Sequence, residues 1–401
     1  MKNNFFGAIN KNILLLSLVS MLNDVSSEMI TPILPLFLKA MGGSSVVIGV
    51  IGGLRDSIAN ILKVVSGYYS DKSGKRKIFV SSGYIFSAIF KFFIAISKTW
   101  QQLIVFSGLE RIGKGFRDAP RDAIIAKYST REQRGRIFGL HRTFDTTGAI
   151  IGSMFAFILL WIFGFSFKNI IMTASIIGIF SLIPLYFVKD TQETEKKHLT
   201  TIKFEFANFP KRLKLFFLVS GIFSLANFSY MFLILKAQEI FTGKLAITAP
   251  IFLYVLYNIF YATFAIPLGI LYDKIGKKKV LILGYLIFCL TSLGFSFAKT
   301  TSQFIGLFIL YGIFYATTEG NQRAYVANLA QKRLSATAIG TFYTITGILT
   351  LSSSIIAGYI WKYISSDATF LFGSITSFIS IILFLICYKT LETPKSEITE
   401  K

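Results

Sequence analysis

Long apolar segments follow one another along nearly the whole length of the 401-residue chain. A helix needs roughly 20 residues to cross the hydrocarbon core of a bilayer, and the chain holds twelve segments of that kind. Their aliphatic residues do not alternate with polar ones, so the pattern argues against a membrane β-barrel. We therefore predict an all-α membrane protein with twelve transmembrane helices. The predicted helices cover residues 13–39, 46–70, 78–98, 101–127, 137–163, 168–188, 214–237, 248–272, 279–298, 302–328, 337–363 and 368–389.

A short polar motif occurs once in each half of the chain, each time between two predicted helices. The sequence GYYSDKSGKRK at residues 67–77 recurs as GILYDKIGKKK at residues 269–279. Internal repeats of this kind are typical of secondary transporters. We therefore predict two pseudo-symmetric six-helix bundles at residues 1–188 and 214–401. Residues 189–213 form the predicted cytoplasmic loop between them, and its stretch 203–213 has the composition of a short helix on the membrane surface.

The net charge of +22 raises the question of a nucleic-acid ligand, but the positions of the basic residues argue against one. Lysine and arginine gather at residues 72–77, 131–136, 189–214 and 274–279, whereas the intervening loops hold mostly single lysines. By the positive-inside bias, this asymmetry predicts a multi-pass protein with both termini in the cytoplasm. The positive charge then serves contact with the anionic lipids of the bilayer.

The repeated motif and the helix count together resemble the major facilitator superfamily. Both copies fit the pattern G-x-x-x-D-[KR]-x-G-[KR]-[KR]. A prokaryotic subgroup of these transporters, with mostly unassigned substrates, is similar over four further segments. These are NDVSSEMITPILPLFL from Asn23, RIGKGFRDAPRDA at 111–123, HRTFDTTGA at 141–149 and EGNQRAYVANL from Glu319. The resemblance implies a monomeric carrier in a prokaryotic cytoplasmic membrane that works by alternating access.

The repeated motif also has a physical interpretation of its own. Its glycines allow close helix contact and a tight turn, Asp71 can accept hydrogen bonds from an arginine or a helix N-terminus, and its basic residues anchor at the inner headgroups. The resemblance implies a cytoplasmic gate, while the alternative is a basic turn that only sets topology. The gate residues of this motif are Gly67, Asp71, Gly74, Lys75 and Arg76, with Gly269, Asp273 and Gly276 in the second copy.

Ionisable residues inside the predicted helices carry most of the functional information, because a charge in hydrocarbon is costly and tends to face a cavity or a partner. Asp24 and Glu28 lie one turn apart on one face of the first helix. Asp56 and Asn60 share a stripe of the second helix with Lys63. The fourth helix carries seven charged residues, which is more than a lipid-facing helix tolerates. They are Glu110, Arg111, Lys114, Arg117, Asp118, Arg121 and Asp122.

Depth divides these residues into two layers. Glu110, Arg111 and Lys114 are expected near the midplane, level with the acids of the first two helices, where we predict substrate and proton handling. The lower layer, closer to the cytoplasm, is predicted to form a salt-bridge network of the inner gate, in which the fourth and fifth helices meet through ion pairs. Pro120 should bend the fourth helix there. The lower layer comprises Arg117, Asp118, Arg121, Asp122, His141, Arg142 and Asp145.

A proton carrier needs a carboxylate that gains and loses its proton as its charged surroundings change. Asp24 and Glu28 are the first candidates, with Asp56 and Glu110 after them. The second half is poorer in charge and offers an apolar, hydrogen-bonding wall for the substrate, although tyrosines at helical spacing also serve plain packing. The predicted substrate-cavity residues are Asn60, Arg111, Lys114, Tyr257, Asn258, Tyr261, Glu319, Gln322 and Arg323.

The family resemblance of the second and fifth helices favours a proton-coupled efflux carrier of a small organic molecule, and two alternatives stay open. The first is uptake of an anionic metabolite by proton symport, because the stretch GAIIGSMFA at 148–156 lacks the proline typical of antiporters. The second is a receptor that binds without transporting. An enzyme is not expected, because the chain has two histidines and neither HExxH, GxSxG nor a P-loop. Its two cysteines lack CxxC spacing, so we expect no metal and no cofactor.

Overall fold

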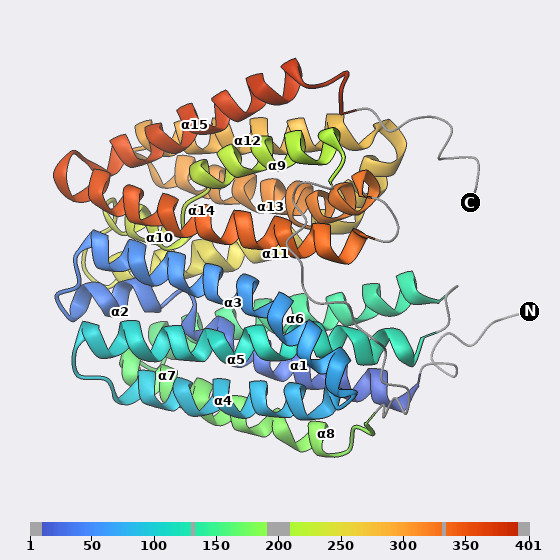
Figure 1. Cartoon of the computed structure of the whole chain (residues 1–401). Coiled ribbons are helices and arrows are strands. Elements are labelled where there is room, and N and C mark those ends of the chain that lie inside the picture. The colour runs from blue at the N-terminus through green and yellow to red at the C-terminus, as the bar shows by residue number, and fades with distance from the viewer. Residues whose placement is uncertain (1–9, 130–132, 191–208, 331–333, 392–401) are drawn as a thin grey trace, which may run out of the picture. The chain divides into compact units, whose positions relative to one another are not determined.

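The computed structural model describes residues 10–129, 133–190, 209–330 and 334–391, and within these ranges every regular element is a helix (Figure 1). The helices of the first half are α1 (Lys11–Ile30), α2 (Leu34–Ala40), α3 (Ser45–Ser73), α4 (Arg76–Ile96), α5 (Trp100–Lys127), α6 (Arg134–Trp161), α7 (Phe167–Phe180) and α8 (Leu182–Tyr186). Those of the second half are α9 (Lys211–Ala226), α10 (Met231–Gln238), α11 (Leu245–Ile275), α12 (Lys277–Phe297), α13 (Thr301–Leu329), α14 (Ser335–Tyr363) and α15 (Ser366–Ile386).

These helices confirm the all-α fold and make up the twelve predicted spans. Ten of the spans are long and apolar enough to cross a membrane by length and composition. The other two, α5 and α13, are the more polar fourth and tenth spans. These two spans occupy the same position in the two halves of the sequence. Residues 191–208 of the predicted central loop lie outside the described residues.

Three spans are each divided into two helices. The break between α1 and α2 includes Pro32, and α8 begins two residues before Pro184. Both breaks lie near a proline because proline has no main-chain N–H to donate within a helix. The break between α9 and α10 contains no proline. There the main-chain N–H of Ser229 donates to Ser354 Oγ over 3.0 Å. Where the helix is interrupted, this N–H has no carbonyl partner within the helix. The Ser354 hydroxyl accepts its hydrogen bond instead, because a main-chain donor must be paired in an apolar environment. Pro120 lies inside α5, which stays continuous.

The chain forms two compact units. One consists of Met1–Gly42, Ile58–Ile202 and Pro250–Val255. The other consists of Gly43–Ser57, Lys203–Ala249 and Leu256–Lys401. Two helices, α3 and α11, contribute to both units, so each unit borrows a segment from the other half of the sequence.

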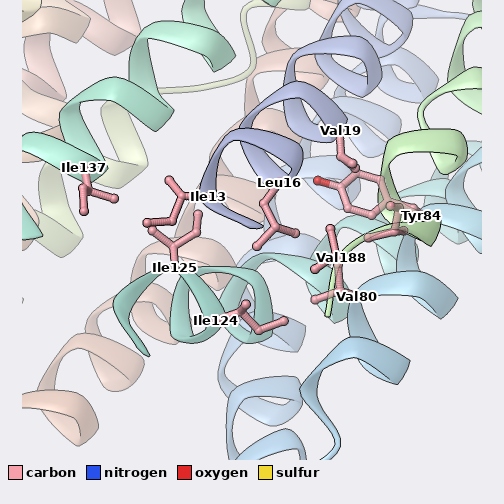
Figure 2. Packing of buried hydrophobic residues seen from close by; sticks show 10 residues of the cluster. Ile13, Leu16, Val19, Val80, Tyr84, Ile124, Ile125, Ile137 and Val188 are labelled. Atoms are coloured by element: carbon pink, nitrogen blue, oxygen red, sulfur yellow. The ribbon is translucent and has the colours of Figure 1, made fainter. Parts of the chain in front are cut away.

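The first unit holds a cluster of buried apolar side chains that ties α1 to its neighbours (Figure 2). Figure 2 shows three residues of α1 gathered with residues of α4, α5 and α6. Because lipid tails are as apolar as these side chains, the cluster stabilises the bundle through close packing rather than by removal from water. The cluster holds the first half of α1, which precedes Asp24 and Glu28 in the same helix. The residues labelled are Ile13, Leu16, Val19, Val80, Tyr84, Ile124, Ile125, Ile137 and Val188.

Two glycines of α6 let that helix lie directly against α1. A Cβ atom added at Gly148 would lie 2.6 Å from the carbonyl oxygen of Met21, and one added at Gly152 would lie 2.3 Å from that of Val25. Both distances are far below van der Waals contact, so only glycine fits. The stretch 148–156 thus has a structural use, which is to place α6 beside the part of α1 that carries Asp24.

We expect Gly152→Ala to lower the melting temperature of the purified protein, since α1 must move to admit the methyl group. Overpacking of this kind costs about 1–3 kcal/mol. The matched control is Gly139→Ala in the same helix, where an added Cβ meets nothing within 4 Å. That control should hold or raise the melting temperature, because alanine favours helix more than glycine does. Equal melting temperatures for the two variants would contradict the close contact.

Candidate functional site

Two carboxylates of α1 form the centre of the candidate site. Asp24 and Glu28 are half-buried and lie one turn apart. Glu28 Oε2 accepts a hydrogen bond of 2.9 Å from Tyr254 Oη of α11. Asp24 has no hydrogen bond or ion pair within the part of the chain that the structure describes. Its surroundings therefore act on it through longer-range charge.

Those charges have both signs. Asp24 interacts electrostatically with Asp145 of α6 and with three cations of α5, which are Lys114, Arg117 and Arg121. Lys114 also interacts with Glu28, and among the described residues it makes no direct ion pair of its own. The site thus contains a carboxylate and an ammonium that influence each other without touching. Such an arrangement can change state when a proton or a charged ligand enters.

Glu110 and Arg111, predicted at the same level, are paired inside the bundle instead. Glu110 is 1% exposed and accepts a hydrogen bond of 2.9 Å from Ser87 of α4 through Oε1. Its Oε2 lies 3.2 Å from Nε of Arg111. Glu110 therefore belongs to the contact between α4 and α5 rather than to the group around Asp24. The fourth candidate acid, Asp56, lies in the second unit and interacts electrostatically with Tyr311 and Tyr315.

The lower layer of α5 is held by partners on α3 and α4. Lys63 Nζ of α3 lies 3.2 Å from Asp118 Oδ2. The guanidinium of Arg117 lies 4.4 Å from the ring centroid of Tyr84 on α4 and 3.9 Å from Asp118 Oδ1. Arg117 is 2% exposed, so its charge depends on the carboxylate and the ring that face it.

The lower charged residues of α5 and of α6 both bind serines of α1. Arg121 pairs with the adjacent Asp122 at 3.0 Å and donates to Ser20 Oγ at 2.7 Å. On α6, His141 Nε2 lies 3.7 Å from Asp145 Oδ2, and its Nδ1 lies 3.1 Å from Ser17 Oγ. Ser17 and Ser20 are one turn apart on α1, so this helix links the two charged groups. Arg142 is exposed.

The first copy of the repeated motif forms a compact turn between α3 and α4. Arg76 donates to Asp71 Oδ1 through Nε at 3.0 Å and through Nη2 at 2.8 Å. Gly74 has a φ of 67°, and a Cβ added at Gly67 would lie 3.3 Å from Ala119 of α5. These contacts match the turn and the close helix approach expected from the sequence. Lys75 follows as the N-cap of α4.

The second copy keeps the turn but not the close contact. Gly276 ends α11 with a φ of 104°, as the sequence predicts for a tight turn. A Cβ added at Gly269 meets nothing within 4 Å, and Asp273 is exposed. The two copies therefore differ in how tightly they join their helices.

Tyrosines of α11 and α13 cluster in the second unit. The rings of Tyr257 and Tyr261 are stacked with centroids 6.3 Å apart, and Tyr311 and Tyr315 lie 5.4 and 5.7 Å from Tyr257. Glu319 accepts a hydrogen bond from Tyr261 Oη. This cluster joins aromatic faces to a carboxylate, a combination that suits organic molecules with a cationic or aromatic part.

The other predicted cavity residues of the second half are more dispersed. Gln322 donates to Tyr285 Oη of α12 at 2.9 Å, and Asn258 is buried. Arg323 is exposed, and Asn60 of the first unit is half-buried.

Sequence reasoning missed one charged residue altogether. Lys91 lies in the apolar third span and is fully buried against Asn23 and Ser26 of α1. A lysine within a hydrophobic stretch was the available signal, because such a charge needs partners inside the protein. The serines Ser17 and Ser20 of α1 were missed as well, and nothing in their local sequence distinguishes them from packing residues.

Comparison with known proteins agrees with the architecture. The sequence profile of the Major Facilitator Superfamily matches residues 16–253 and 216–401. An uncharacterised MFS-type transporter of Methanocaldococcus jannaschii is 52% identical over 380 residues, which cover 94% of this chain and 95% of that protein. The multidrug resistance protein MdtH of Salmonella paratyphi C is 31% identical over 144 residues, 36% of this chain and 35% of its own length. A crystal structure of a variant of the nucleoside transporter NupG superposes with a TM-score of 0.81 at 16% identity, covering 94% of this chain and all of that chain (100%).

Proposed function

The chain belongs to the major facilitator superfamily and is a multi-pass membrane transporter, and we propose that it exports a small organic molecule in exchange for protons. The proposed carrier works as a monomer in a prokaryotic cytoplasmic membrane with both termini inside. Its two proposed halves are residues 1–188 and 214–401, joined by the loop 189–213. Alternating access between these halves then moves the cargo.

One observation carries the proton coupling. Asp24 is half-buried, and among the described residues it has no direct partner, while Lys114 and Arg121 act on it from a distance. An acid locked in a short ion pair has little freedom to exchange its proton, but Asp24 is not locked. Entry of a cargo between Asp24 and the cations of α5 changes the balance of charge at the carboxylate. The proton then leaves or binds as the cargo binds or leaves.

The remaining site residues take supporting roles in this proposal. Glu28, held by Tyr254, is the second proton-carrying acid, while Asp56 and Glu110 act less directly. Lys114 faces the cargo from α5, and the neighbouring Arg111 is held by Glu110. The tyrosine cluster of α11 and α13 with Glu319 supplies aromatic and carboxylate contacts to the cargo. The turn at Asp71 and the lower layer of α5 and α6 form the inner gate.

Two observations bear on direction. Similarity to a protein named for multidrug resistance supports efflux, and the aromatic cluster with its carboxylate suits a cationic or aromatic drug-like cargo. The cations of α5 favour the second candidate, uptake of an organic anion with a proton, because Lys114 is not neutralised by a direct partner within the described residues.

Proteoliposomes with a proton gradient and an internal pH dye distinguish these functions. The test compounds are a lipophilic cation (ethidium), an organic anion (salicylate) and a nucleoside (uridine). Exchange predicts that one compound dissipates the gradient as it moves against the proton. Accumulation of salicylate together with protons would replace efflux by uptake. Binding of a compound without any movement of compound or proton would indicate a receptor and overturn the proposal.

A further inference from the structure

Lys91 is a charged residue in the interior of the first unit for which the proposed transport cycle has no role. It lies on α4, five residues before the end of that helix, and its exposed fraction is 0%. Lysine is almost never fully buried unless its ammonium is paired, and inside a membrane protein such a residue is by default functional. Its surroundings therefore need an explanation of their own.

Three oxygen atoms of α1 surround the ammonium. Lys91 Nζ donates to Ser26 Oγ at 2.9 Å, to Asn23 Oδ1 at 3.2 Å and to the carbonyl oxygen of Asn23 at 3.4 Å. Asn23 and Ser26 are themselves 2% and 0% exposed. An ammonium has three N–H donors and no lone pair. Each donor of Lys91 thus has one acceptor in this pocket.

The other hydrogen bonds of Asn23 and Ser26 show that their side-chain oxygens act as acceptors toward Lys91. The Ser26 hydroxyl donates its own proton to the carbonyl oxygen of Ala174 on α7, so its lone pair faces Lys91. Asn23 Nδ2 donates to Ser27 Oγ at 3.5 Å, which turns Oδ1 toward Lys91. A neutral amine in this place would present its lone pair to acceptors alone. The pocket therefore matches a cation by its donor and acceptor pattern.

The pocket's acceptors are all neutral. Within the part of the chain that the structure describes, Lys91 has no carboxylate at ion-pair distance. The charged groups that act on it at longer range are Glu110, Arg111 and Arg117 of α5 and Asp24 of α1. Two of the three direct contacts of the ammonium go to Asn23, the residue that precedes Asp24 in the chain, and the third goes to Ser26. They bind α4 to α1 at the level of the proposed proton-carrying acid.

We propose that Asn23 and Ser26 form a monovalent-cation pocket on α1, which the tethered ammonium of Lys91 fills in order to position Asp24. Lys91 is thus a positioning residue, and its role rests on the proposed function of Asp24. A Cβ added at Gly178 of α7 would lie 2.9 Å from Ser26 Oγ, so a larger residue there would press on the pocket from behind. Glycine at this position leaves Ser26 free to bind both Lys91 and the carbonyl of Ala174.

Chemical rescue tests the pocket without any transport substrate. Lys91→Ala removes the ammonium and three methylene groups, which together equal one propylammonium ion. We expect millimolar propylammonium to raise the melting temperature of purified Lys91→Ala by several degrees and to leave the wild type unchanged. The neutral 1-propanol fills the same volume and should give no rise. An equal rise with 1-propanol, or none with propylammonium, would show that the site does not select a cation.

Hydrogen exchange and transport test the positioning role. We expect Lys91→Met, which keeps the volume but not the charge, to speed amide exchange in α1 around Asn23 and to lower proton-coupled flux about 100-fold, the size of effect that a misplaced reacting group produces. The matched control, Lys98→Met, changes an exposed lysine just beyond the same helix and should affect neither.

The outcomes separate this inference from the proposed function. Wild-type flux and exchange in Lys91→Met, together with loss of proton coupling in Asp24→Asn, would overturn the role of Lys91 alone. Full proton coupling in Asp24→Asn would overturn the proposed function and with it the positioning role. If Lys91→Met does not fold, the propylammonium rescue of Lys91→Ala decides, because it reports on the charge rather than on packing.

Discussion

Replacing Asp24 by asparagine is expected to lower proton-coupled flux by at least about 100-fold, the usual contribution of a positioned group that transfers a proton. The amide has the size of the carboxylate but neither binds nor releases a proton at working pH. Because Asp24 has no direct partner among the described residues, its neutralisation leaves no orphaned ion and the fold should persist. The measurement is proton movement in proteoliposomes driven by the compound that the screen identifies.

Two further variants make this result specific. Asp367→Asn removes a carboxylate of α15 whose side chain is 61% exposed, while Glu239 still pairs with Lys236, so this variant should transport normally. Glu28→Gln should have a smaller effect than Asp24→Asn, since glutamine can still accept the hydrogen bond from Tyr254. If Asp24→Asn pumps like the wild type while Glu28→Gln does not, the proton carrier is Glu28 and our assignment within the pair is wrong.

Asp118→Asn is expected to produce the largest loss of stability among the charged residues of α5. Asp118 faces Lys63 at 3.2 Å and Arg117 at 3.9 Å, and it also interacts with Arg121 and Lys114. Its removal leaves Arg117, which is 2% exposed, without the carboxylate beside it. Breaking a buried pair in this way costs about 3 kcal/mol. We expect a melting temperature lower by several degrees, measured on protein purified in detergent.

The neighbouring acid provides the control for this prediction. Asp122 pairs with Arg121, and its side chain is 31% exposed, so Asp122→Asn should cost about 1 kcal/mol or less. Ser20 still accepts from Arg121 in that variant. The proposed gate would lose its basis if Asp122→Asn were as destabilising as Asp118→Asn, or if both melted like the wild type.

The twelve spans could be predicted from the sequence because the bilayer imposes one length and one composition on every crossing segment. Each predicted span corresponds to a helix or a pair of helices, with ends that differ by a few residues. The break between α9 and α10 could not be predicted in the same way. Ser354, more than a hundred residues away, satisfies the main chain at Ser229, and no local signal announces that bond.

The candidate site could be predicted in part. Asp24, Glu28 and Lys114 are predicted from the sequence because charges inside apolar segments are rare and costly. The partner of Glu28 could not be predicted, since Tyr254 comes from α11. The partner of Arg121 could not be predicted either, since Ser20 lies in a stretch with no feature beyond those of an ordinary helix. The sequence also predicts a role for Glu110, but only the structure shows that it lies between α4 and α5, where Ser87 donates to it.

Lys91 shows the limit of pattern reading most clearly. In the sequence it is one lysine in an apolar span. Its burial depends on three oxygen atoms of α1, from residues that lie 65 and 68 positions earlier in the chain. The roles of Gly148 and Gly152 also depend on a helix that is distant in the sequence. A motif search asks whether a proline is present between them, but the structure gives them a use in placing α6 against α1.

Proton release on cargo binding is the most direct test of the claim that Asp24 exchanges its proton for cargo. Purified protein in weakly buffered detergent solution, with a pH dye, is mixed with the compound that the transport screen identifies. Proton-coupled efflux through Asp24 predicts that the wild type releases protons and that Asp24→Asn, although it still binds the compound, releases none. Equal release from both proteins, or none from either, would contradict the central role of this carboxylate.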